Sequence, residues 1–218
     1  LAGLAELAPD IPVLSEESDE LPWSERKAWD RYFLIDPLDG TKEFINRNGE
    51  FTVNVALIEN HTPVMGVVHV PVKNILYAGI GGPEPSAFVE RGGEREIIRT
   101  RPLDRQHLTV VASRRHGGDA LKGCLEKLAA HFPDIDTRNM GSSLKLCLVA
   151  EGQADLYPRL APTSEWDTAA AQAVVEAAGG MVVDTAFSPV RYNAKEDILN
   201  PHFYVLGDPA FDWQRILG

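Results

Sequence analysis

The sequence predicts a mixed fold of the α/β (α+β) class, and three patterns support this expectation. Between residues 51 and 80, apolar and polar side chains alternate, with turn residues at the breaks, as in antiparallel strands. From residue 107 onward, short apolar runs alternate with segments whose apolar residues have helical spacing. The last of these helical segments is rich in alanine and ends at Gly179 and Gly180.

The first 50 residues predict short elements that end in acidic side chains. Residues 1–10 have the pattern of an amphipathic helix, and residues 11–14 and 31–36 form apolar strands. Pro37 lacks an N–H group, so it is expected to end the second strand, and Gly40 relieves the turn that follows. Residues 41–47 resemble the start of a short helix with Thr41 near its N-terminus, where free N–H groups favour an anion.

The rest of the sequence predicts a chain of two halves. Antiparallel strands are expected at residues 51–60, 64–72 and 74–82, and a hairpin at 86–96. The charged segment 99–107 is the expected boundary between an N-terminal α+β half, residues 1–105, and a C-terminal α/β half, residues 106–218. In the second half, strands are expected at 108–113, 154–160, 181–184 and 203–207, and helices at 117–132, 144–154 and 163–180.

Composition and charge restrict the class of protein. The 218 residues are 44% hydrophobic and 24% charged, which is ordinary globular usage. A formal net charge of −11 argues against nucleic acid as a partner, but it leaves a phosphorylated small molecule open. No apolar run is long enough to span a bilayer. Cys124 and Cys147 have no metal-like spacing, so reduced thiols in a cytoplasmic protein are expected.

Four carboxylates lie at the ends of predicted elements: Glu16, Asp36, Asp39 and Asp167. Asp36 and Asp39 are so close in sequence that they need a shared proton or a cation between them. Carboxylate oxygens suit Mg²⁺, and Asp36 could bridge two ions, with Asp39 and Asp167 on one. Glu16 and the carbonyl of Leu38 would hold the other. The alternative is that Asp36 and Asp39 form a structural turn after the strand.

Three motifs decide between these alternatives by resemblance. They are "LSEES" at residues 14–18, "DPLDGTKEF" at 36–44 and "WDTAAAQAVVEAAGG" at 166–180. They resemble the signatures of the inositol monophosphatase superfamily, in the same order. The resemblance implies a sugar-phosphatase fold, a layered α-β-α-β-α sandwich.

Longer stretches, among them "GSSLKLCLVAEGQADLYPR", are most similar to the bacterial 3′(2′),5′-bisphosphate nucleotidases of the CysQ type. That resemblance implies a Mg²⁺-dependent, lithium-sensitive phosphatase. It would convert 3′-phosphoadenosine 5′-phosphate into AMP and phosphate.

The resemblance also implies roles for individual residues. Two or three Mg²⁺ ions would be held by Glu16, Asp36, Leu38, Asp39 and Asp167. Glu16, Thr41 and Asp36 are the expected catalytic residues, with Glu16 and Thr41 orienting the attacking water. The substrate would contact Leu38, Asp39, Gly40, Thr41, His116, Ser142, Lys145, Arg159 and Asp167.

Several alternatives stay open. Ser142 could instead serve as a helix N-cap. The substrate could be an inositol phosphate or fructose 1,6-bisphosphate, or the chain could be an inactive homologue that binds a phosphometabolite. An aspartate that the superfamily carries near its N-terminus has no match before Glu16, so an N-terminal segment is expected to be missing, with weak activity if so. A homodimer and peripheral attachment at the inner membrane face also stay open.

Overall fold

The computed structural model describes residues 2–19, 21–112 and 118–218. Seven strands form the first sheet in chain order: β1 (Val13–Ser15), β2 (Arg31–Asp39), β3 (Thr52–Glu59), β4 (Thr62–Val70), β5 (Ile75–Ile80), β6 (Ser86–Arg91) and β7 (Glu94–Ile97). β1 is parallel to β2, and the other neighbours are antiparallel. The predicted meander and the hairpin that turns at Gly92 and Gly93 are confirmed.

Pro37 does not end β2, so that prediction was wrong. Asp36 pairs with Asn54, and Asp39 pairs with Thr52, with a register shift between the two pairs. A bulge leaves one residue of the ladder unpaired, which suits a proline that has no N–H to donate. The irregularity therefore keeps Asp36 and Asp39 on the same strand end.

The second sheet has five strands in the order β11-β12-β10-β8-β9. They are β8 (His107–Ala112), β9 (Asp134–Asn139), β10 (Leu156–Arg159), β11 (Met181–Asp184) and β12 (Phe203–Leu206). Four of them were predicted, although the expected end of the first at Ser113 lies outside the described residues. β9 was not predicted, because this mostly exposed edge strand has a polar sequence without apolar alternation.

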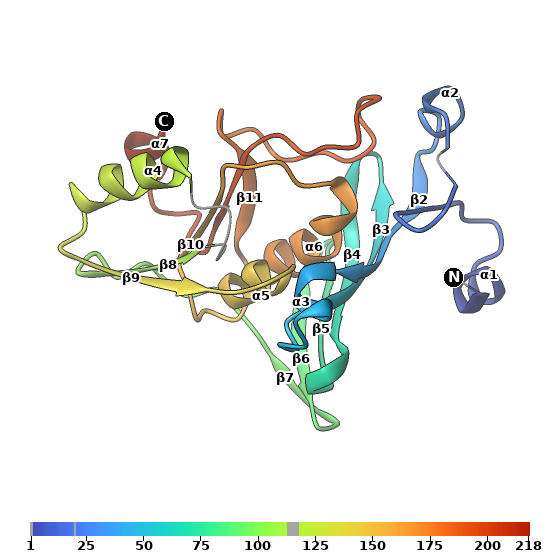
Figure 1. The fold of residues 1–218 in the computed structure, drawn as a ribbon, viewed down its shortest axis with the longest axis horizontal. Coiled ribbons are helices and arrows are strands. Elements are labelled where there is room, and N and C mark those ends of the chain that lie inside the picture. The colour runs from blue at the N-terminus through green and yellow to red at the C-terminus, as the bar shows by residue number, and fades with distance from the viewer. Residues whose placement is uncertain (1, 20, 113–117) are drawn as a thin grey trace.

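Helices and sheets alternate in layers (Figure 1). α4 (Asp119–Ala129) and α7 (Gln214–Leu217) lie on one side of the second sheet, and α5 (Leu144–Ala150) and α6 (Ala169–Ala177) lie between the two sheets. α1 (Ala2–Leu7) lies beyond the first sheet, where Leu4 packs against Phe33 and Ile35 of β2. The predicted mixed, layered fold is confirmed. The short segments are α2 (Trp23–Arg26), α3 (Thr41–Ile45) and the 3₁₀ turns η1 (Pro71–Lys73) and η2 (Glu165–Asp167).

Two paired glycines let α6 approach the first sheet closely. Gly66 of β4 pairs with Gly79 of β5. A Cβ atom at Gly66 would lie 2.0 Å from the carbonyl oxygen of Ala170, and one at Gly79 would lie 2.5 Å from the Cα of Val174. Any larger side chain would push the helix away. This contact fixes the start of α6 relative to the first sheet, and η2, which carries Asp167, directly precedes that start.

The core joins both sheets. A large cluster of buried apolar side chains draws on β2 to β6, on α5 and α6, and on β8 and β10 to β12. Cys124 and Cys147 are buried free thiols, as predicted. None of the described helices is long and apolar enough to cross a bilayer. Residues 98–106 contain no helix or strand, and the division into two halves there stays a prediction.

Candidate active site

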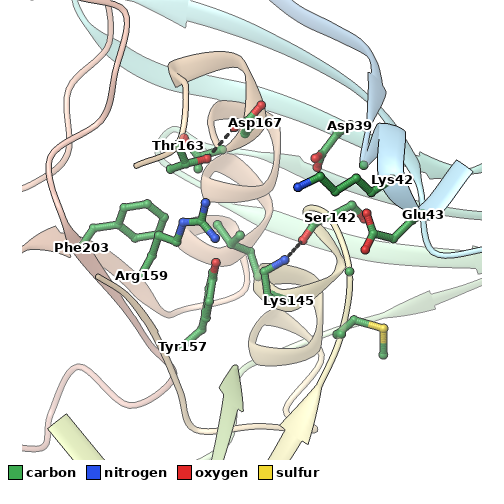
Figure 2. A pocket seen from close by; sticks show the side chains of 15 residues that line it. Asp39, Lys42, Glu43, Ser142, Lys145, Tyr157, Arg159, Thr163, Asp167 and Phe203 are labelled. Carbon is green, nitrogen blue, oxygen red and sulfur yellow. Dashed lines mark hydrogen bonds between the residues drawn. The ribbon is translucent and has the colours of Figure 1, made fainter. Parts of the chain in front are cut away.

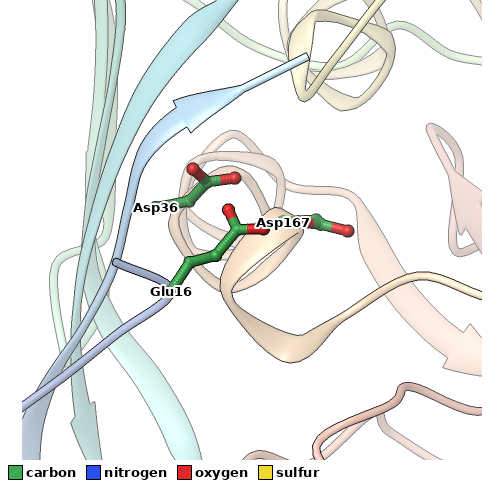
Figure 3. Close-up of side chains that lie close together, drawn as sticks. All are labelled: Glu16, Asp36 and Asp167. Atoms are coloured by element: carbon green, nitrogen blue, oxygen red, sulfur yellow. The ribbon is translucent and has the colours of Figure 1, made fainter. Parts of the chain in front are cut away.

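Three of the four predicted acidic residues meet in one cluster. Glu16 follows the end of β1, Asp36 lies on β2 and Asp167 ends η2. One carboxylate oxygen of each lies within 4.8 Å of the others (Figure 3). The neighbouring parallel strands β1 and β2 and the turn before α6 therefore bring three carboxylates to one point, although up to 151 residues separate them in the chain (167 − 16).

Asp36 is the buried member of this cluster, with 1% of its surface exposed. Its Oδ1 accepts a hydrogen bond from the N–H of Leu38 at 2.8 Å, whereas its buried Oδ2 has no partner. Burial, together with the charge of Asp39, raises the pKa of Asp36 to about 9. An unpartnered buried carboxylate oxygen beside two other acidic groups is stable when a cation binds there.

Asp167 is held by its own turn. Its Oδ2 accepts hydrogen bonds from the hydroxyl of Thr163 at 2.5 Å and from the N–H of Ser164 at 2.9 Å. Burial raises the pKa of Asp167 to about 6, and Asp39 contributes to the shift. The helix predicted at residues 163–180 begins later than expected, so Asp167 lies in η2, before α6 starts at Ala169. The capping box of Ser164 with Asp167 explains this separate turn.

Asp39 lies outside this cluster, and its role as a metal ligand stays a prediction. Among the described residues, the cluster within 4.8 Å comprises Glu16, Asp36 and Asp167, and does not include Asp39. Its Oδ2 instead accepts hydrogen bonds from Thr52, Asn54, and both the N–H and the hydroxyl of Ser143. Asp39 is still near enough to raise the pKa of both Asp36 and Asp167.

A pocket opens beside the cluster, lined by Asp39, Asp167 and cationic side chains (Figure 2). Lys145 of α5 and Arg159 of β10 were predicted to line it, and both do. Lys42 of α3 also lines it and was missed, although its place next to Thr41 was a signal that could have found it. Three carboxylates, Asp39, Glu43 and Asp167, line the pocket as well, so the three cationic side chains offer contacts for an anionic ligand while the carboxylates offer contacts for a cation.

The cations are held differently. Lys145 is almost fully buried, with 6% of its surface exposed, and its ammonium donates to the carbonyl of Ser142 at 2.6 Å. Burial lowers the pKa of Lys145 to about 8. The guanidinium of Arg159 donates to the carbonyls of Ala161 and Pro162 at 3.1 and 2.6 Å. Backbone carbonyls thus orient both side chains.

The two serines before α5 take different positions. Ser143, not Ser142, occupies the N-cap position of α5, so the capping alternative for Ser142 was wrong. Ser142 lines the pocket with a left-handed φ of 44°, and its buried hydroxyl has no partner. Such a conformation in a non-glycine residue is uncommon and concentrates at functional sites. Ser143 was missed, because its contacts come from three distant segments.

Gly40 lines the pocket, whereas Thr41, the first residue of α3, is not among its lining residues. Gly40 has a φ of 93° and occupies the N-cap position, as the turn required. The side chain of Thr41 is exposed, and it begins the helix as predicted. His116, the remaining predicted contact, lies outside the described residues. The metal-ligand role of the Leu38 carbonyl stays a prediction.

The donor set fits a hard divalent cation. Three carboxylates converge, one of their oxygens is buried without a partner, and no thiolate or imidazole belongs to this cluster of described residues. Carboxylate oxygens are the ligands that Mg²⁺ prefers in proteins. The acidic cluster is therefore a candidate Mg²⁺ site.

Comparison with known proteins agrees with this geometry. Residues 1–207 match the inositol monophosphatase family. The chain is 53% identical over 203 residues to the 3′(2′),5′-bisphosphate nucleotidase CysQ of Shigella flexneri, covering 93% of this chain and 78% of that protein. It is 52% identical, with the same coverage, to CysQ of Escherichia coli strain K12.

Solved structures give the same result. CysQ from Bacteroides thetaiotaomicron has a TM-score of 0.85 and 43% identity, covering 94% of this chain and 80% of that one. An inositol monophosphatase from Thermotoga maritima has a TM-score of 0.72 and 26% identity, covering 94% and 73%. The acidic cluster, the layered fold and these matches agree, and the chain belongs to the inositol monophosphatase family, as a member of the CysQ type.

Proposed function

We propose that this protein is a Mg²⁺-dependent 3′(2′),5′-bisphosphate nucleotidase. It hydrolyses the 3′-phosphate of 3′-phosphoadenosine 5′-phosphate and releases AMP and phosphate. The observation that carries the proposal is the position of the acidic cluster next to a pocket lined by Lys42, Lys145 and Arg159. A substrate with two phosphates needs a reaction site for the 3′-phosphate and cationic side chains that bind the 5′-phosphate. The similarity to curated nucleotidases supports the choice of substrate.

Glu16, Asp36 and Asp167, with Asp39 through its other oxygen and the carbonyl of Leu38, would hold two or three Mg²⁺ ions. When bound, these ions activate water and stabilise negative charge on the attacking and leaving oxygens. The unpartnered Oδ2 of Asp36 supports this assignment.

The remaining residues position the reactants. Glu16 and Thr41 orient the water that attacks the phosphorus in line with the leaving 3′-oxygen. The N–H groups of Gly40 and Thr41 bind phosphate oxygens at the start of α3. Asp36 contributes as a metal ligand next to the reacting phosphate, and it does not transfer a proton. Positioning and electrostatic stabilisation would then supply most of the barrier reduction.

The pocket would bind the rest of the nucleotide. Lys145 and Arg159 would contact the 5′-phosphate, and Ser142 would donate its unpartnered hydroxyl. His116 is a further proposed contact. Two buried free thiols support a reducing, cytoplasmic location. Light scattering on the purified chain would test the homodimer that the resemblance left open.

The test is phosphate release with Mg²⁺ from four substrates: 3′-phosphoadenosine 5′-phosphate, inositol 1-phosphate, inositol 1,4-bisphosphate and fructose 1,6-bisphosphate. We expect kcat/KM for the nucleotide to exceed the others by about tenfold or more, since each charged contact that one substrate lacks costs about 1.4 kcal/mol or more. Lithium should inhibit the reaction. A preference for an inositol phosphate would overturn the substrate assignment, and nucleotide binding without hydrolysis would favour the inactive homologue.

A further inference from the structure

The hydroxyl of Ser143 lies where three segments of the site meet. Its Oγ is 2.7 Å from Oδ2 of Asp39 and 2.6 Å from the carbonyl oxygen of Asp167. It accepts a hydrogen bond from Nδ2 of Asn54 at 2.8 Å. Ser143 is 1% exposed and Asn54 is fully buried. Its single hydrogen is shared between the end of β2 and the turn η2, while Asn54 near the start of β3 donates to its oxygen.

We propose that Ser143 is a positioning residue that fixes Asp39 relative to Asp167 and so sets the divalent-cation affinity of the acidic site. This inference rests on the proposed metal site. Its first support is the selectivity of the contacts: all four hydrogen bonds to Asp39 that the structure gives go to Oδ2. The other oxygen, Oδ1, is left for a ligand, with its direction set by the four donors.

The second support is the contact with Asp167. Ser143 touches the backbone carbonyl of Asp167, while Thr163 and Ser164 hold its side chain. Ser143 therefore fixes the position of the η2 turn, while Thr163 and Ser164 fix the direction of the Asp167 carboxylate. Among the described residues, Ser143 is the only one whose side chain lies within hydrogen-bond distance of both Asp39 and Asp167.

The third support is the environment of the hydroxyl. Asn54 is buried, and its Nδ2 has two acceptors, Ser143 Oγ at 2.8 Å and Asp39 Oδ2 at 3.3 Å. A buried amide in two hydrogen bonds resists rotation, because turning it would leave donors unpaired. Removing a residue that hydrogen-bonds to a metal ligand commonly changes the metal affinity about 10- to 100-fold.

The experiment is Mg²⁺ titration of the substrate-free chain by calorimetry, with Ser143→Ala compared with wild type. We expect the dissociation constant for Mg²⁺ to rise about 10- to 100-fold. In kinetic assays, half-maximal activity should need correspondingly more Mg²⁺, while KM for the nucleotide at saturating Mg²⁺ stays within about threefold. A purely structural role would lower thermal stability and leave the Mg²⁺ dissociation constant unchanged.

Thr109→Ala is the matched control. Thr109 is also 1% exposed, and its hydroxyl accepts a hydrogen bond from Arg101 at 3.0 Å, but it lies in β8 away from the cluster. It should lower stability to a similar degree without changing Mg²⁺ affinity. Should Ser143→Ala not fold, Ser143→Cys carries the test, because a thiol is nearly isosteric but a weak donor.

The outcomes separate this inference from the proposed function. A Mg²⁺ dissociation constant for Ser143→Ala within about twofold of wild type would overturn the role of Ser143, even if the wild type hydrolyses the nucleotide. A wild type that binds Mg²⁺ but hydrolyses no substrate would overturn the proposed function, while the loss of affinity in Ser143→Ala would still support Ser143. Wild-type protein that binds no Mg²⁺ would overturn both.

Discussion

The ammonium group of Lys145 donates a hydrogen bond to the carbonyl of Ser142 at 2.6 Å, three residues earlier in the chain. The same ammonium lies 5.6 Å from the centre of the Tyr157 ring. This buried cation is held by one carbonyl and one aromatic face, and burial lowers its pKa from 10.5 to about 8. Burying this cation lowers the stability of the fold, and it places a positive charge at the pocket.

The first prediction follows from this cost. Between pH 8 and 10.5 the unfolded chain keeps a proton that folded Lys145 has lost, so the free energy of unfolding rises with pH. The contribution of this group is about 3 kcal/mol. Because Asp36 opposes this rise below pH 9, urea unfolding of the Mg²⁺-free wild type should show the rise between pH 9 and 10.5, and Lys145→Met should lack it. Lys122→Met, at a side chain that is 76% exposed, should retain the wild-type slope. Equal slopes for wild type and Lys145→Met would refute the burial argument.

The second prediction concerns Asp36. Asp36→Asn should lower kcat/KM by about a thousandfold or more, because losing a cation contact at the reacting phosphate costs about 4 kcal/mol. Thermal stability without metal should stay the same or increase, since the change removes a carboxyl group that the metal-free fold must keep protonated beside Glu16, Asp39 and Asp167. Phosphate release and circular dichroism measure the two effects. Asp136→Asn, on edge strand β9, serves as the control, and near-normal turnover of Asp36→Asn would exclude the acidic cluster as the site.

The third prediction is that Mg²⁺ affinity increases with pH. Protons compete with the cation for Asp36, whose pKa is raised to about 9, and for Asp167, whose pKa is raised to about 6. Binding should therefore tighten by up to about tenfold per pH unit above pH 6 and level off near pH 9, with release of protons. In the metal-free protein the same raised pKa makes the fold less stable as pH rises toward 9. Calorimetry in buffers of different ionisation enthalpy measures both affinity and proton release, and a flat profile would contradict the prediction.

The fourth prediction concerns Gly40 and its left-handed backbone. Gly40 and Gly93 have φ values of 93° and 87°, so alanine at either position should destabilise the fold by about 1 kcal/mol. An added Cβ at Gly40 would lie 3.4 Å from Ser142, whereas one at Gly93 would meet nothing within 4 Å. Only Gly40→Ala should also reduce kcat/KM, because Gly40 lines the pocket and Gly93 does not. Chemical unfolding and phosphate release on both variants check this, and equal activity losses would contradict a role for the Gly40 turn.

Regular periodicity made most of the fold predictable. The strands of the first sheet and the helices α4 and α5 show clear two-residue or helical spacing, and the structure has them close to the predicted ranges. The predictions at Pro37 and β9 were wrong because pairing with a neighbouring strand decided the structure there. A bulge let β2 continue beyond a residue that cannot donate, and pairing with β8 ordered a polar segment that has no strand pattern of its own.

By itself, the sequence determined the residue types of the site and their order: Glu16, Asp36, Gly40 in the turn, and Asp167 near an alanine-rich segment. Only the tertiary structure decided which carboxylates meet, and how. The close approach of α6 at Gly66 brings Asp167 to Asp36, while Ser143 contacts both Asp39 and the turn of Asp167. The physical reason is that burial and hydrogen bonding depend on packed neighbours, and these neighbours come from segments far apart in the chain.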